Sequence, residues 1–138
     1  MSGILSRWPV VVTLPVTASD RDADGMLVDA AVERMFAQAR ATYLEVCSTV
    51  DPSTIEVRST RVQPGECAVS ADEVTVSVGV VELFPETFTM HARIRPAGPA
   101  DGDGLAATAT SSLAPSGGVS TAMRDEFINH AHSAVDFH

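Results

Sequence analysis

Asp20-Arg21-Asp22-Ala23-Asp24-Gly25 is the stretch that decides the fold of this 138-residue chain, because it separates two segments of different periodicity. The residues before it, Val10-Val11-Val12-Thr13-Leu14-Pro15-Val16, are mostly β-branched, which predicts a strand at about 9–18. After the turn, apolar residues recur at the i, i+3, i+4, i+7 spacing of a one-sided helix from about Asp29 to Cys47. The apolar stripe of this helix consists of Val32, Met35, Phe36, Ala39, Tyr43, Val46 and Cys47.

The alternating carboxylates of this acidic turn allow two interpretations, a calcium loop or a catalytic turn at the start of a helix. An EF-hand loop needs oxygen ligands at positions 1, 3 and 5, glycine at 6 and a bidentate glutamate at 12. Asp20, Asp22, Asp24 and Gly25 fit the first half, but Ala31 stands where the glutamate should be. The preceding segment is also a predicted strand rather than a helix. Both departures favour the catalytic turn and predict no metal site.

Composition limits the functional classes. Length and a 45% hydrophobic content fit one domain, residues 1–138, with a core at about 9–115 and a short helix or tail at about 120–138. All nine basic residues are arginine, so a lysine Schiff base and a Walker-type P-loop are excluded. The net charge of −9 argues against nucleic acid or an anionic membrane as partner. No apolar run predicts a membrane span or a secretory signal, so we expect a cytoplasmic protein. The alanine-rich, lysine-free composition suggests a bacterial genome rich in G and C.

Beyond residue 55 the apolar period changes to two, which predicts a run of antiparallel strands. We expect these strands at about 55–62, 73–84, 88–95 and 105–115, a flexible hairpin loop at 96–104 and a short helix at 123–132. One strand, one long helix and several further strands predict an α+β fold, with an antiparallel sheet of about five strands wrapped around one long central helix. The exposed edges of so small a sheet favour pairing with a second copy.

The motif Asp20-x-Asp22-x-x-Gly25, followed by Phe36-x-x-Ala39-Arg40-x-x-Tyr43-Leu44, resembles the start of hotdog-fold acyl-CoA thioesterases of the 4-hydroxybenzoyl-CoA thioesterase type. The resemblance covers roughly residues 10–127, and Asp72-Glu73-Val74-Thr75-Val76 is similar to the start of the family's third strand. It implies the hotdog fold and hydrolysis of an acyl-CoA thioester with no cofactor. It also implies a homodimer or homotetramer with ligand tunnels at the subunit interface.

The resemblance assigns roles to individual residues. The family's catalytic carboxylate corresponds to Asp22, which would act as base or nucleophile in a turn shaped by Gly25. Backbone N–H groups at the helix start, near Asp29, would hold the oxyanion. Asp20 and Asp24 are expected to be solvated turn residues. The residues expected to bind substrate are Met26 and Val28 beside the turn, and Arg58, Arg61 and Arg93 as candidates for the phosphates of CoA.

The chain departs from the family pattern immediately after the turn. Many members continue Gly-His-Val-Asn-Asn, whereas this chain has Gly25-Met26-Leu27-Val28-Asp29. Met26 replaces the histidine, and the negative charge of Asp29 would oppose an oxyanion beside it. The alternative function is therefore a non-catalytic acyl-CoA-binding or assembly module on the same fold. A hotdog hydratase would show a D-x-N-x-x-H-type signature, which this sequence lacks.

Overall fold

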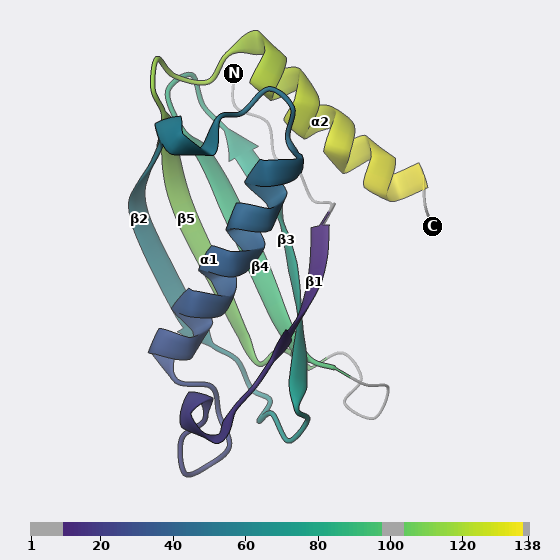
Figure 1. Ribbon diagram of the computed structural model, residues 1–138. Coiled ribbons are helices and arrows are strands. Elements are labelled where there is room, and N and C mark those ends of the chain that lie inside the picture. The colour runs from purple at the N-terminus through teal and green to yellow at the C-terminus, as the bar shows by residue number, and fades with distance from the viewer. Residues whose placement is uncertain (1–9, 98–103, 137–138) are drawn as a thin grey trace.

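The computed structural model describes residues 10–97 and 104–136, with side chains described as far as residue 130. These residues form an α+β structure in which five antiparallel strands make one sheet of order β1-β3-β4-β5-β2 (Figure 1). The strands are β1 (Val10–Pro15), β2 (Ile55–Pro64), β3 (Glu73–Leu83), β4 (Phe88–Pro96) and β5 (Ala107–Pro115). The helices are α1 (Asp29–Val46), α2 (Thr121–Asp136) and the 3-10 helices η1 (Ala18–Asp20) and η2 (Pro52–Thr54).

The predicted elements are found close to their expected positions. Strand β1 is shorter than predicted, because Pro15 ends its pairing with β3 and η1 follows. Helix α2 begins two residues before the expected start at Met123 and continues to Asp136, so it is longer than predicted. Most of the loop expected at 96–104 lies outside the described residues.

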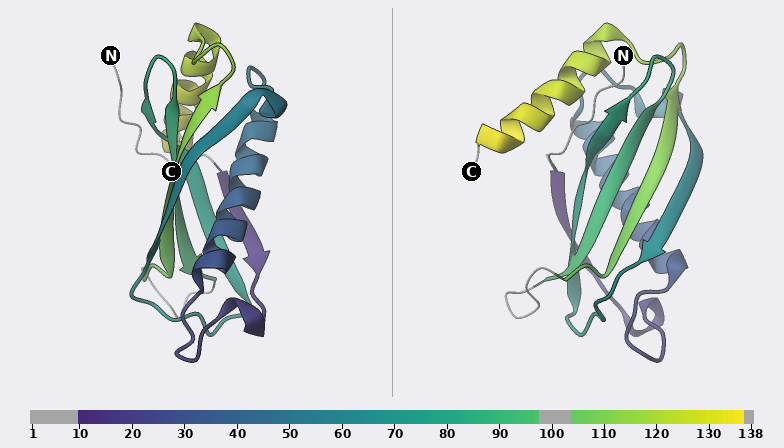
Figure 2. Two further views of the ribbon diagram at one scale, coloured as in Figure 1. Left: turned by 90° about the vertical axis from the view of Figure 1, so that its left-hand side faces the viewer. Right: turned by 180° about the vertical axis from the view of Figure 1, so that it is seen from behind.

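Helix α1 packs against one face of the sheet, and the core lies between them (Figures 1 and 2). The alternating residues Val74, Val76, Val78 and Val80 of β3 are all buried on this inner face. Burial of a side chain of this size contributes about 1.5–3 kcal/mol, so this row of valines contributes substantially to the stability of the fold. The small Ala39 of α1 is also fully buried, which lets the helix lie close to the strands.

The predicted apolar stripe of α1 is buried except at Val46, near its C-terminal end. Val46 was expected in the core, but its side chain is 58% exposed. Leu44 is buried instead, because it lies on the same side of the helix as Tyr43 and Cys47, which are both buried. The helix also ends at Val46, so no following helical turn packs over that side chain.

Helix α2 crosses the end of the sheet beside the C-terminal end of α1 (Figure 1). Its Phe127 is buried, and the centroid of its ring lies 4.8 Å from that of the Phe88 ring and 6.1 Å from that of the Tyr43 ring. The Glu126 carboxylate accepts hydrogen bonds from the backbone N–H and hydroxyl groups of Ser48 and Thr49, just after α1. These contacts attach α2 to the core.

The outer face of the sheet is left uncovered by the described helices (Figure 2, right). Its residues are largely polar, in agreement with the alternation of apolar and polar residues along the strands. Strand β2 lies at the sheet edge, and most of its residues are exposed. Among the described residues, no helix is long and apolar enough to cross a membrane.

Candidate functional site

The acidic turn is a short hairpin that ends where α1 begins. Arg21 and Leu27 form an antiparallel bridge, and the Asp22 N–H donates to the Met26 carbonyl over 2.8 Å. The Asp22 side chain is exposed, and its Oδ1 accepts hydrogen bonds from the backbone N–H groups of Asp24 at 2.9 Å and Met26 at 3.0 Å. Its second oxygen, Oδ2, has no hydrogen-bond donor among the described residues. Asp22 therefore both shapes the turn and keeps one carboxylate oxygen available.

The N-terminus of α1 has no side-chain cap. Val28 occupies the N-cap position and offers no hydrogen-bonding side chain, whereas Ser, Thr, Asp or Asn is usual there. The Val28 carbonyl accepts from Ala31 and Val32, but within the described part of the chain the N–H groups of Asp29 and Ala30 have no acceptor. Unpaired amides at a helix N-terminus carry partial positive charge and can bind an anion. Asp29 is exposed, so its carboxylate is in solvent.

Asp20 is not a solvated turn residue, and that expectation is wrong. Its side chain is buried, and its oxygens accept hydrogen bonds from Arg34 Nη1 at 2.8 Å and Nη2 at 3.0 Å. Oδ2 also accepts from the Thr17 N–H. The hydrogen bonds from Arg34 and Thr17 hold the pKa of this carboxyl well below its usual range, against the opposing effect of burial. The pair ties the start of the turn to the second turn of α1.

Gly25 lies where the turn requires a left-handed backbone, with φ of +82°. Its carbonyl accepts from the Val69 N–H at 2.9 Å, and a Cβ at this position would lie 3.4 Å from the Cβ of Ala68. The loop between β2 and β3 therefore packs against the acidic turn. Met26 and Val28, expected beside the substrate, are half-buried on either side of the buried Leu27.

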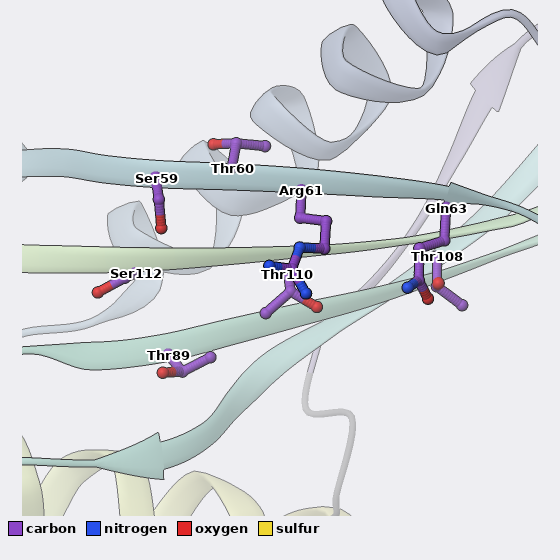
Figure 3. Close-up of a pocket in the computed structure, with 8 residues that line it drawn as sticks. All are labelled: Ser59, Thr60, Arg61, Gln63, Thr89, Thr108, Thr110 and Ser112. Atoms are coloured by element: carbon purple, nitrogen blue, oxygen red, sulfur yellow. The ribbon is translucent and has the colours of Figure 1, made fainter.

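The arginines expected to hold CoA phosphates lie away from α1. Arg61 lines a groove on the outer face of the sheet (Figure 3). Arg93 on β4 lies opposite Thr108, another residue of that groove. Arg58 is exposed and forms a 2.8 Å ion pair with Glu56. Within one protomer the sheet separates these side chains from the helix side of the molecule. The arginine that contacts the acidic turn is instead Arg34, through Asp20, although nothing in its sequence context indicated this role. Arg21, within the turn, donates to the Ala71 carbonyl.

A second polar cluster lies between α1 and α2. The His130 Nδ1 atom is 3.2 Å from the Tyr43 hydroxyl and 4.0 Å from Cys47 Sγ, and its Nε2 is 3.8 Å from a Glu126 oxygen. The order of thiol, imidazole and carboxylate is that of a nucleophilic triad. However, burial raises the pKa of Cys47 to about 12, which leaves the thiol protonated at neutral pH. The contacts of His130 with Tyr43 and Cys47 attach α2 to the C-terminal end of α1.

The geometry also bears on the calcium interpretation. The oxygens of Asp20 are occupied by Arg34 and Thr17, so they do not converge with those of Asp22 and Asp24. Among the described side chains, those of residues 10–97 and 104–130, no three His, Cys, Asp or Glu groups are placed to hold a metal ion.

Comparison with known proteins identifies the fold. No protein-family model matches the sequence, and no curated protein matches it either. Among solved structures, a thioesterase from Thermus thermophilus complexed with coenzyme A and Zn is 20% identical, with a TM-score of 0.74 over 93% of this chain and 98% of that one. The gentisyl-coenzyme A thioesterase BH1999 is 17% identical, with a TM-score of 0.67 over 87% of this chain and 100% of that one.

A third structure is a mutant of 4-hydroxybenzoyl-CoA thioesterase complexed with 4-hydroxybenzoyl-CoA. It is 14% identical, with a TM-score of 0.63 over 77% of this chain and 82% of that one. The fold of this chain is thus the hotdog fold of these thioesterases, as the resemblance of the acidic turn and helix implied.

Proposed function

We propose that this protein is a thioester hydrolase that acts on acyl-CoA, with Asp22 as base or nucleophile and the first amides of α1 as the oxyanion hole. The observation that carries the proposal is the juxtaposition, in one short hairpin, of a carboxylate oxygen without a donor and a helix N-terminus without a cap. The shared fold supports the class of substrate, since the similar structures are thioesterases and two of them contain coenzyme A or an acyl-CoA.

The proposed chemistry has two routes. In the first, Oδ2 of Asp22 attacks the thioester carbon, the C–S bond breaks with departure of the CoA thiolate, and water then cleaves the mixed anhydride. In the second, Asp22 takes a proton from water as the water oxygen attacks the same carbon, the C–S bond then breaks, and the departing CoA thiolate takes the proton from Asp22. In both routes the amides of Asp29 and Ala30 stabilise the negative charge that forms on the carbonyl oxygen.

We propose that a second copy of the chain completes the site. In one protomer Asp22 and Asp29 are exposed to water, where hydrogen bonds to an oxyanion contribute little. Strand β2 is an edge strand with an exposed Val57, and such an edge commonly pairs with another chain. A homodimer or homotetramer would exclude water from the helix start and form a tunnel for the acyl chain between protomers.

The alternative function is a binding or assembly module that holds acyl-CoA without cleaving it. Two observations favour it: Asp22 already has a structural role in the turn through Oδ1, and Met26 stands where many hotdog thioesterases have histidine. The carboxylate of Asp29 at the helix start would also weaken binding of an oxyanion.

Thiol release distinguishes the two functions. A panel of aliphatic and aromatic acyl-CoAs is incubated with the protein, while free thiol and the melting temperature are measured in parallel. The thioesterase proposal expects catalytic release of thiol from at least one acyl-CoA. Ligand-dependent stabilisation across the panel without any thiol release would instead establish the binding module and reject hydrolysis.

A further inference from the structure

The outer face of the sheet carries a polar groove of about 400 Å³ that the proposed thioester chemistry does not use. It is lined by the hydroxyl groups of Ser59, Thr89, Thr108, Thr110 and Ser112 and by the guanidinium of Arg61. Figure 3 shows the Arg61 side chain extending across β5 toward Thr110, with Gln63 beside Thr108. None of the described residues that line the groove is Asp or Glu.

Strand pairing gathers basic residues around this groove, and its positive charge comes from the arginines. In the strand register, Arg61 of β2 lies opposite Thr110 of β5, and Thr110 lies opposite His91 of β4. In the neighbouring row, Thr108 pairs with Arg93. On β3 the residues opposite His91 and Arg93 are Gly79 and Ser77, so these two rows contain basic and neutral residues only. This concentration is unexpected from composition, because the chain as a whole carries a net charge of −9.

Two further features indicate a positive potential on this face. Burial lowers the pKa of His91, and the nearby charge of Arg93 lowers it further. Arg95, two residues along β4 on the same face, has a buried Nε atom with no hydrogen-bond acceptor among the described residues. Two acids border the groove: Glu82 lies opposite Thr89 in the strand register, and Glu66 shares a neighbouring hollow with Thr108.

We propose that this groove binds a phosphate-bearing anion, with Arg61 and the hydroxyls of Thr108 and Thr110 as its ligands. A guanidinium group donates two parallel hydrogen bonds to phosphate oxygens, and hydroxyl groups add further donors. A neutral polyhydroxyl ligand would also need strong acceptors, which carboxylates supply and this lining lacks. The volume lies in the range of small-molecule sites, so it suits a diphosphate or a nucleotide phosphate.

The groove lies across the sheet from α1, so the inference does not depend on hydrolysis by Asp22. Two ligand sources share the phosphate chemistry: free polyphosphate and the phosphates of coenzyme A. Titration calorimetry with pyrophosphate and with coenzyme A separates them. If the groove recognises phosphate alone, both ligands bind and compete with each other. Pyrophosphate fails to compete for bound coenzyme A if that molecule binds elsewhere.

The test uses three proteins: the natural chain, Arg61→Gln, and Arg124→Gln as a matched control on the exposed surface of α2. We expect pyrophosphate to bind the natural chain and Arg124→Gln equally, and to bind Arg61→Gln at least tenfold more weakly. A Thr108→Val variant, which keeps the charge, is expected to weaken binding by a smaller factor. Circular dichroism of each variant verifies the fold.

Equal pyrophosphate affinity in all three proteins, or no binding by the natural chain at millimolar ligand, would overturn the proposal. Sedimentation velocity examines the other occupant of an exposed sheet face, a second copy of the chain. If Arg61→Gln dissociates an oligomer and the natural chain binds no pyrophosphate, the face is a contact between copies and the anion site is rejected.

Discussion

Breaking the ion pair between Asp20 and Arg34 is expected to destabilise the protein and to loosen the acidic turn. Asp20 is 4% exposed, and Arg34 donates to both of its carboxylate oxygens. The Arg34 side chain is 52% exposed, so solvent screens part of the attraction. Breaking a fully buried pair costs roughly 3–5 kcal/mol, whereas an exposed pair contributes about 0–1 kcal/mol. We therefore expect a coupling energy of about 1–2 kcal/mol between the two side chains.

A double-mutant cycle measures this coupling. The free energy of unfolding in urea at pH 7 is determined for the natural chain, Asp20→Asn, Arg34→Gln and the double variant. The pair Glu56–Arg58 is the matched control, because its N–O distance is also 2.8 Å but its side chains are 70% and 61% exposed. Its coupling should be about 0.3 kcal/mol. Equal coupling in the two pairs, or additive effects of the Asp20 and Arg34 substitutions, would refute the reasoning.

The same pair predicts a pH dependence. The folded pKa of Asp20 lies below its unfolded value because Arg34 and Thr17 donate hydrogen bonds to the ionised form. Its contribution to stability is therefore complete above about pH 4 and is lost as the pH falls below that value. The difference in unfolding free energy between the natural chain and Asp20→Asn should shrink steadily below about pH 4, and a constant difference would contradict this.

Two other features of the structure give predictions. Burial tends to raise the pKa of Glu126, but hydrogen bonds from Thr49 and Ser48 outweigh it and lower the pKa to about 2. Because this is below the unfolded value, α2 should be less firmly held as the pH falls from about 4.5 toward 2. The melting temperature of Glu126→Gln should then vary less with pH than that of the natural chain. At Gly65, a Cβ would lie 2.0 Å from the Leu105 carbonyl oxygen. Gly65→Ala should therefore cost more than about 2 kcal/mol in urea unfolding. At Gly117, φ is +83°, and an added Cβ would meet no described atom within 4 Å apart from its own chain neighbours, so alanine should cost only about 1 kcal/mol. Equal losses at the two positions would contradict the clash.

Much of the fold could be predicted because local patterns determine it. The alternation of Val74, Val76, Val78 and Val80 identifies β3 and its buried face, and the spacing of apolar residues identifies α1. The turn between β1 and α1 was also recognisable from its glycine and carboxylates. These features depend on neighbours in sequence, so no knowledge of distant contacts was needed.

The parts that could not be predicted depend on contacts between distant residues. Nothing in the acidic turn distinguishes Asp20 from Asp22 and Asp24, yet only Asp20 faces Arg34 and becomes buried. The placement of the arginines was missed for a similar reason. Because β2 pairs with β5 rather than with β3, Arg61 and Arg93 come to lie on the outer face with Thr108 and Thr110 between them. Sequence order alone does not give that strand order.

The role of Asp22 is tested most directly by the kcat of Asp22→Asn relative to that of Asp24→Asn, with a saturating acyl-CoA. An asparagine at position 22 keeps an Oδ1 acceptor for the amides of Asp24 and Met26, so the turn persists while the negative charge is removed. Position 24 is an exposed carboxylate in the same turn and reports the effect of charge alone. We predict that kcat falls by about 10²–10⁴-fold in Asp22→Asn and by less than about threefold in Asp24→Asn. Equal kcat in the two variants would show that Asp22 takes no part in the reaction.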